Sequence, residues 1–144
     1  MRLDMVFEKR VITAGPEATL SEIAELMDGN GVGAVVITDD ERPVGIITDR
    51  DLAIALGTGR ADRTEPARTV MTAHVTTISC HEGIFAATRK FSDHGLRRLP
   101  IVDEDGRLCG LVTLDELLIL LGHEVGNLAR SVRVELESAG VAPR

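Results

Sequence analysis

Two pairs, Thr48 with Asp51 and Thr113 with Glu116, place a threonine hydroxyl three residues before a carboxylate at the start of a predicted helix. Thr19 and Glu22 have the same spacing at an earlier helix start. At the start of a helix this spacing forms a capping box, in which each side chain accepts a hydrogen bond from the backbone N–H of the other residue. A threonine that caps a helix can also contact a ligand, and an ionised carboxylate accepts several hydrogen bonds. Helix capping and ligand binding are therefore both open for the two pairs, and Thr-x-x-Glu is the better capping sequence.

Two adjacent arginines, Arg97 and Arg98, lie between a predicted helix and a predicted strand. The planar guanidinium group matches the oxygen atoms of a phosphate, so these residues are the strongest candidates for binding an anion. The positions 64 residues earlier hold Gly33 and Ala34, so a site built on the arginines would be asymmetric. The alternative is an ion pair with a surface carboxylate, which we expect for at least one of them.

Metal binding and catalysis have weaker support in the sequence. Cys80 and His81 are adjacent, with His74 upstream, but two neighbouring ligands in a turn do not make a tetrahedral set. Neither cysteine belongs to a CxxC motif, so the sequence indicates no disulfide framework and no zinc motif. The chain has no P-loop, no HExxH motif and no Ser/His/Asp order. We therefore predict a protein that is not an enzyme, with a metal-responsive role kept as a minor alternative.

The composition is that of a globular protein with an acidic surface. The chain has 144 residues, 44% of them hydrophobic, and a formal net charge of −7. An acidic chain is a poor general binder of nucleic acid or of anionic membranes. No apolar run reaches the length of a membrane span, and the acidic start of the chain does not resemble a signal peptide. We therefore expect a cytoplasmic protein without a nucleic-acid or membrane partner.

The elements that would position these residues come from a repeat. The stretch from Gly45 to Leu52 returns 65 residues later, from Gly110 to Leu117. Upstream, the two halves match at an offset of 64 in Val11/Val75, Thr13/Thr77, Leu20/Ile84, Met27/Phe91, Gly31/Gly95, Ile37/Ile101 and Asp39/Asp103. A period of this length indicates a duplicated supersecondary unit. One unit of about 60 residues would be marginally stable alone, so the two are expected to pack together.

The sequence pattern of each half predicts elements in the order β-α-β-β-α. In the first half we predict strands at 11–13, 33–37 and 44–47, and helices at 19–30 and from Thr48 to about Gly57. In the second half we predict strands at 75–78, 99–102 and 108–112, and a helix at 83–94, before a last helix that starts near Leu114. Residues 57–69 are polar and irregular, which is typical of a linker.

The last helix is longer than its counterpart in the first half. Its apolar residues recur at spacings of three and four and form one stripe: Leu114, Leu117, Leu118, Leu121, Val125, Leu128, Val132 and Leu136. The segment 117–121 is apolar nearly all round, so we expect it to be buried on more than one side. The later part has a narrow apolar stripe between charges and is expected to pack on a partner chain or on the edge of the protein itself.

The duplicated unit resembles the CBS-domain family, and two units together resemble a tandem CBS pair, or Bateman module. The likeness rests on Gly45 to Asp51, Gly110 to Glu116, His94 to Asp103 and the lead-in Val70-Met71-Thr72, and it covers about residues 5–125. It implies an α+β fold of two pseudo-symmetric β-α-β-β-α CBS units packed as one disc-like module, with two clefts and an extended C-terminal helix. We predict a first unit at 5–56, a linker at 57–69, a second unit at 70–125 and a C-terminal helical extension at 126–144.

The resemblance also implies a ligand. In this family the clefts can bind adenine nucleotides or related adenosyl compounds, and the modules commonly form dimers. By that likeness Thr48 and Asp51 would bind the ribose hydroxyls, and Arg97 and Arg98 the phosphate. The adenine would lie against Val11, Thr13 and Val35. A second, weaker cleft would involve Thr77, Thr113 and Glu116, where the longer glutamate departs from the ribose-binding aspartate of the family.

The sequence therefore predicts a regulatory protein that senses AMP, ATP or another adenosyl compound and acts through a homodimer or an effector protein. It does not select one adenosyl ligand, and it does not name the effector. The main alternative is a dimeric interaction scaffold whose cleft binds no ligand.

Overall fold

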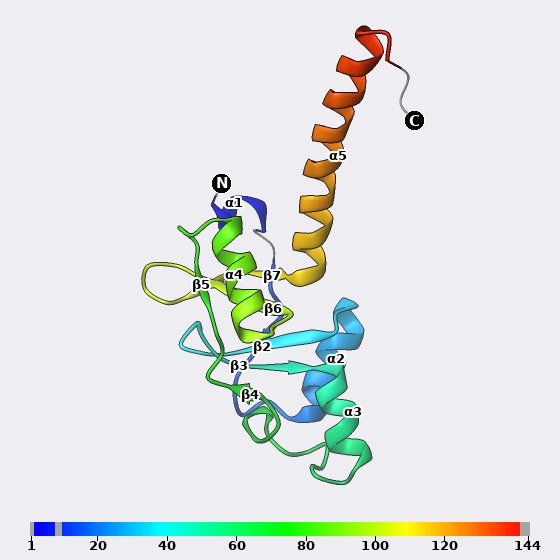
Figure 1. Ribbon diagram of the computed structural model, residues 1–144. Helices are drawn as coiled ribbons and strands as arrows, with labels where there is room; N and C mark the ends of the chain where they lie inside the picture. The colour runs from blue at the N-terminus through cyan, green and yellow to red at the C-terminus, as the bar shows by residue number, and fades with distance from the viewer. Residues whose placement is uncertain (1, 8–9, 142–144) are drawn as a thin grey trace. The chain divides into compact units, whose positions relative to one another are not determined.

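The computed structural model describes residues 2–7 and 10–141, and Figure 1 shows its α+β architecture. The chain divides into two units, Met1–Val112 and Thr113–Arg144, each described by itself below. The elements run in the order α1 (Leu3–Val6), β1 (Thr13–Ala14), α2 (Leu20–Asn30), β2 (Ala34–Asp39), β3 (Arg42–Thr48), α3 (Asp49–Gly57), η1 (Ala67–Thr69), β4 (Thr72–Ala73), β5 (Ile78–Ser79), α4 (Ile84–His94), β6 (Arg98–Val102), β7 (Leu108–Thr113) and α5 (Leu114–Ser138). The predicted α+β class with a long last helix is confirmed.

The first sheet has the strand order β1-β2-β3-β4. Strand β1 is parallel to β2, whereas β2 with β3 and β3 with β4 are antiparallel. Helices α2 and α3 pack on β2 and β3 and on each other. Their apolar faces, the inner faces of the strands and Ala67 of η1 form one core cluster: Leu20, Ile23, Met27, Val35, Ile37, Ile47, Leu52 and Ala67. This core fixes the junction of β3 and α3, where Thr48 and Asp51 lie.

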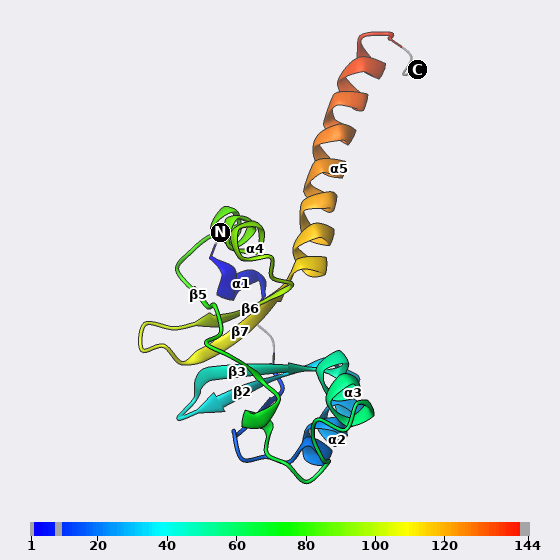
Figure 2. The same ribbon diagram turned by 60° about the horizontal axis from the view of Figure 1, so that its bottom comes forward.

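The second sheet has the order β5-β6-β7, with β5 parallel to β6. The hairpin turns of the two sheets meet: Leu108 N–H donates to the carbonyl of Glu41 at 2.9 Å, and Arg42 Nε donates to the carbonyl of Asp105 at 3.1 Å. Figure 2 shows the β2–β3 and β6–β7 pairs one above the other. The two halves therefore pack together within the first unit of the structure.

Each lead-in segment contacts the opposite half. Met71, in the lead-in of the second half, packs on the first core cluster and lies against Gly45. Near the start of the chain, Leu3 N–H donates to the carbonyl of Glu82 at 3.4 Å. A Cβ atom added to Gly110 would lie 3.0 Å from the carbonyl oxygen of Phe7. The two contacts obey the same pseudo-symmetry as the repeat, and they tie the halves together.

Two predicted strands are shorter than expected and are displaced. The strand predicted at 11–13 is β1, Thr13–Ala14, and the strand predicted at 75–78 is β5, Ile78–Ser79. Both lie at the edge of a sheet and pair with one neighbour only. The β-branched residues before these two strands favour an extended backbone. A strand is formed only where the neighbouring strand supplies hydrogen-bond partners, so β1 and β5 are short.

The predicted linker is irregular but well anchored. It ends in the short helix η1, and Ala67 at the start of η1 is fully buried. Ala67 N–H donates to the carbonyl of Ala18 at 2.7 Å, and the linker carbonyls of Arg63 and Glu65 accept from the first residues of α2 at 2.9 Å. The linker therefore packs against the first half along its length.

The second unit is the 25-residue helix α5 with its ends, and the prediction of a last helix longer than its counterpart α3 is confirmed. The helix ends at Ser138, within the extension predicted at 126–144. The prediction that its first part is buried on more than one side is wrong for the single chain, because Leu118 is 59% exposed and Ile119 is 61% exposed. An apolar run requires burial, but it does not specify which element provides it. Residues 142–144 of the predicted extension lie outside the described residues. Within the described ranges, no helix is both long and apolar enough to cross a membrane.

Candidate functional site

Thr48 and Asp51 form the capping box that the sequence predicts for α3. Thr48 Oγ1 accepts from Asp51 N–H at 3.2 Å, and Asp51 Oδ2 accepts from Thr48 N–H at 2.9 Å. Within the described residues, Asp51 Oδ1 accepts no hydrogen bond. The threonine hydroxyl has used an acceptor site and still has its O–H to donate. The pair can therefore cap α3 and offer hydrogen bonds to a ligand at the same time.

Asp51 lines a cavity of about 420 Å³. The other lining residues come from the face of α3, from the linker and from the lead-in to the second half: Ile54, Ala55, Arg60, Ala61, Glu65, Thr69 and Val70. The walls combine aliphatic surface with two carboxylates, a hydroxyl and a guanidinium. Small-molecule sites have this combination, and their volumes are typically about 300–1,000 Å³.

Arg60, Glu65 and Thr69 are cavity residues that sequence reasoning missed, because all three lie in the segment predicted to be a linker. Arg60 forms no ion pair within the described part of the chain. Glu65 Oε1 accepts from Asp62 N–H at 3.1 Å, which holds the loop in a tight turn. No local pattern marks these residues, because their position depends on the packing of the linker against the first half.

Arg97 and Arg98, the candidates for binding an anion, lie where the chain passes from the end of α4 to the start of β6. Arg97 is exposed, and Arg98 is half-buried at the first position of β6. Neither residue lines the cavity at Asp51. Their counterpart Gly33 accepts from Asp49 N–H at 3.0 Å, and a Cβ atom at Gly33 would meet the carboxylate of Asp49 at 3.2 Å. The two halves therefore differ at this position in shape as well as in charge.

The residues predicted to hold adenine are divided between two places. Val11 and Thr13 line a second cavity of about 240 Å³, together with Thr38, Glu41, Leu108 and Cys109. Val35 lies in the middle of β2 and is fully buried in the core cluster, so only its backbone could contact a ligand. These three residues do not line the cavity at Asp51.

Of the residues assigned to a second cleft, Thr77 lies in the structural unit Met1–Val112, and Thr113 and Glu116 lie in the unit Thr113–Arg144. Thr77 is half-buried, and its carbonyl accepts from Lys90 Nζ at 2.8 Å. Thr113 and Glu116 form the capping box of α5, with both hydrogen bonds at 3.2 Å. The predicted capping role of Thr113 and Glu116 is therefore confirmed.

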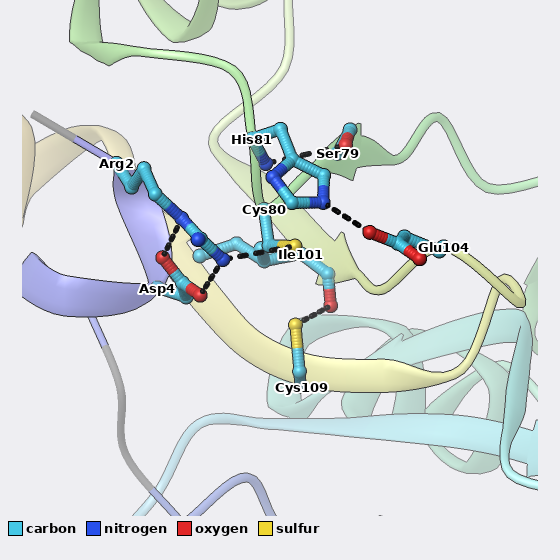
Figure 3. Close-up of polar contacts among 8 residues, drawn as sticks. All are labelled: Arg2, Asp4, Ser79, Cys80, His81, Ile101, Glu104 and Cys109. Carbon is cyan, nitrogen blue, oxygen red and sulfur yellow. Dashed lines mark hydrogen bonds and ion pairs between the residues drawn. The ribbon is translucent and has the colours of Figure 1, made fainter.

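Cys80 and His81, the residues of the metal alternative, contact different partners, as Figure 3 shows. The imidazole of His81 contacts Glu104, with 3.0 Å between Nε2 and Oε1. Cys80 Sγ lies 3.9 Å from a guanidinium nitrogen of Arg2. Within residues 2–7 and 10–141, no group of three or more His, Cys, Asp or Glu side chains is arranged to hold a metal ion.

The second cysteine, Cys109, has a thiol whose pKa is raised well above its ordinary value. Its Sγ donates to the carbonyl of Ile101 at 3.4 Å, which Figure 3 also shows. Burial raises the pKa of the Cys109 thiol to about 11, with smaller contributions from Cys80, Asp103 and Asp4. At neutral pH the side chain is therefore a neutral thiol, which is a poor nucleophile and a poor metal ligand.

Comparison with known proteins identifies the repeat. The profile of the CBS domain matches residues 4–58 and 67–123. An uncharacterized protein of Methanopyrus kandleri is 40% identical over 130 residues, which are 89% of this chain and 66% of that protein. The chain thus spans slightly less than two thirds of the length of this relative.

Two solved structures have the same fold. The CBS domain pair of protein MJ0100, in complex with 5′-methylthioadenosine and S-adenosyl-L-methionine, aligns with a TM-score of 0.75 and 26% identity over 86% of this chain and 98% of that one. A CBS domain protein of Pyrobaculum aerophilum complexed with AMP aligns with a TM-score of 0.74 and 23% identity, over 85% of this chain and 99% of that one.

Proposed function

This chain belongs to the CBS-domain family, and we propose that it is a non-enzymatic regulatory module that binds an adenosyl nucleotide. The observation that carries the proposal is the cavity of about 420 Å³ that Asp51 lines. The ligands in the two similar structures, S-adenosyl-L-methionine with methylthioadenosine and AMP, share an adenosyl group. A common adenosyl group agrees with the likeness between Thr48-x-x-Asp51 and the ribose-binding motif of the family.

The chemistry of Asp51 supports recognition of ribose. A ribose has two adjacent hydroxyl donors, and an ionised carboxylate can accept from both. Asp51 uses Oδ2 to cap α3 and keeps Oδ1 for such a contact. Hydrogen bonds to charged groups contribute about 1.5–3 kcal/mol each, enough to select a nucleoside over its 2′,3′-dideoxy analogue.

Arg97 and Arg98 remain our proposed phosphate ligands, through an approach to the ligand from the second half. One of them would face the phosphate, and the other would form an ordinary surface contact. Replacement of the phosphate-facing arginine by Met should weaken AMP or ATP by about tenfold, because a charge-assisted hydrogen bond is lost. Adenosine should bind nearly as before. Titration calorimetry that finds AMP and ATP unaffected by both substitutions would remove this role.

The ligand proposal has a direct spectroscopic test. The chain contains no Trp, no Tyr and three Phe, so its own near-ultraviolet absorbance is very weak. Protein that retains a purine ligand through purification should show a clear absorbance maximum in the purine band. AMP, ATP or S-adenosylmethionine is then added to ligand-free protein at a concentration of about 100 times the Kd of the ligand. The bound ligand should raise the free energy of unfolding by about 2.7 kcal/mol. A flat spectrum together with no thermal shift for any of these compounds would overturn the proposal.

The second candidate is a dimeric interaction scaffold without a ligand, and the exposed apolar face of α5 favours it. A homodimer also fits the ligand-binding module, so we propose dimerisation in both cases, with an effector protein as a further partner. The absorbance and thermal-shift results separate the two functions. We further propose that the protein acts in the cytoplasm, a reducing compartment that suits its two free cysteines.

A further inference from the structure

The linker supplies a cation to the cavity at Asp51. Arg60 lies three residues beyond the end of α3, and its side chain forms part of the cavity wall. The polar lining otherwise includes the carboxylates of Asp51 and Glu65 and the hydroxyl of Thr69. Within the described residues the guanidinium of Arg60 has no ion-pair partner. Arg60 is therefore the one cation on this wall, and its charge is available to a ligand.

The backbone holds Arg60 in place. Gly59 adopts a left-handed conformation with φ of 71°, which reverses the chain after the helix and favours glycine. On either side of Arg60, Gly59 N–H donates to the carbonyl of Leu56 at 3.3 Å, and Ala61 N–H donates to the carbonyl of Ala55 at 3.1 Å. Hydrogen bonds to α3 therefore fix the position of the loop and of the Arg60 backbone within it.

The distance along α3 indicates what Arg60 would contact. Asp51 lies in the first turn of the helix and Gly57 is its last residue, so about 9 Å of helix axis separate them. A ligand whose ribose lies at Asp51 must extend along the helix to approach Arg60. A bare nucleoside lacks such an extension, whereas a nucleoside phosphate carries an anionic one that a guanidinium binds well.

We propose that Arg60 binds the anionic group of the ligand that the Asp51 cavity holds, and that this contact selects nucleoside phosphates over nucleosides. The inference rests on the proposed function. It adds a residue from the linker, between the two repeated units, to those that the family motif implies. A competing explanation is that Arg60 only complements the negative end of the α3 dipole, which would affect stability slightly and affinity not at all.

The test compares two arginines of the same loop. Arg60→Met removes the cation from the cavity wall, and Arg63→Met removes an exposed cation that does not line the cavity. Calorimetry is performed on the full chain with adenosine, AMP, ADP and ATP. Arg60→Met should weaken the tightest-binding phosphate compound by about tenfold or more and leave adenosine within twofold. Arg63→Met should leave both unchanged, and Arg60→Lys should restore part of the loss.

The outcomes separate this inference from the proposed function. If adenosine and a phosphate compound bind the wild type and Arg60→Met weakens neither, or weakens both equally, the role of Arg60 is overturned and the ligand site stands. If none of the four compounds binds the wild type, the role of Arg60 is overturned, and the absorbance spectrum and the thermal shift with S-adenosylmethionine decide the proposed function. Circular dichroism and the melting temperature of Arg60→Met identify a folding defect, and in that case Arg60→Lys and Arg60→Gln provide the comparison.

Discussion

At the scale of single residues, Asp51 shows how one carboxylate can serve both fold and function. Its Oδ2 completes the capping box of α3, and Oδ1 has no hydrogen bond within the described residues. Glu116 forms the same box in α5 with a side chain that is longer by one methylene. The hydrogen bonds of the two boxes are nearly the same, so capping alone does not distinguish Asp51 from Glu116. We propose that the two residues differ in their contact with the ligand.

The first prediction separates capping from ligand binding with isosteric changes. Asp51→Asn keeps an oxygen that can cap α3 and removes the charge, so adenosine should bind about tenfold more weakly with little change in stability. Glu116→Gln is the matched change in the other box, and it should alter adenosine affinity by less than twofold. Titration calorimetry and thermal melts measure both effects. Equal losses of affinity in the two variants would contradict the proposed difference between the clefts.

A second prediction at this scale concerns Cys109, whose pKa is raised from an ordinary value of 9.0 to about 11, mainly by burial. In a Cys80→Ser background, its alkylation by iodoacetamide should be slow at pH 8 and should accelerate with a midpoint above pH 9, because burial, the largest cause of the raised pKa, remains. In urea the midpoint should return to about 9. Because the folded state favours the protonated thiol, the contribution of Cys109 to stability is full below pH 9 and is lost between pH 9 and 11. A folded-state midpoint near 9 would contradict the burial of the thiol.

At the scale of elements, local signals predicted the helices that carry the candidate site. The boxes predicted at Thr48 and Thr113 are present, a third box lies at Thr19, and α2 ends where Gly31 takes a left-handed conformation. Each of these signals depends on residues within one turn of the helix end, which the sequence contains in full.

The cavity wall was not predictable in the same way. The segment that contains Arg60 and Glu65 has no periodic pattern. Hydrogen bonds to α3 hold the chain on either side of Arg60, whereas Glu65 is positioned by a hydrogen bond to Leu20, 45 residues earlier. These are bonds to backbone carbonyls, which every residue type carries, so the residue types of the linker do not specify them. The sequence therefore indicates that a connection exists and leaves its course unspecified.

The helix α5 presents an apolar face that the single chain leaves exposed. Val125 is 65% exposed and Leu128 is 69% exposed, and both belong to the stripe that also contains Leu121 and Val132. Exposed contiguous apolar surface of this kind is typical of interaction sites. Val134 is also exposed, but it lies nine residues after Val125, or two and a half turns, and thus on the opposite side of the helix.

The stripe leads to a prediction with a control on the same helix. If two copies pair through this face, Leu128→Glu should convert a dimer to a monomer at micromolar concentration, because the substitution would place charge in an apolar contact. Val134→Glu adds the same charge outside the stripe and should leave the dimer intact. Sedimentation velocity distinguishes these species. A wild-type monomer, or equal effects of the two substitutions, would exclude pairing through the stripe.

At the scale of the whole chain, the duplication predicted that the two repeated halves pack together, but it did not predict which segments connect them. Residues 70–73 pack on the first half and β4 pairs with β3, while residues 2–7 contact the second half. The repeat has the same pattern whether a lead-in packs on its own half or on the other one. Only the tertiary contacts, such as those of Met71 with Gly45, distinguish the two arrangements.

The last prediction tests this exchange of lead-ins at Gly110. A Cβ atom there would lie 3.0 Å from the carbonyl oxygen of Phe7 and 3.2 Å from Ile101 Cδ1, and a backbone atom cannot move aside as a flexible side chain can. Gly110→Ala should therefore cost about 1–3 kcal/mol in urea unfolding, as overpacked substitutions do. Amide exchange should become faster in residues 2–7 and remain slow in α2. Gly29→Ala, where no atom lies within 4 Å of the added Cβ, should be neutral or slightly stabilising. If Gly110→Ala is as stable as Gly29→Ala, or if exchange accelerates equally throughout the chain, the N-terminal segment does not hold the second half in place.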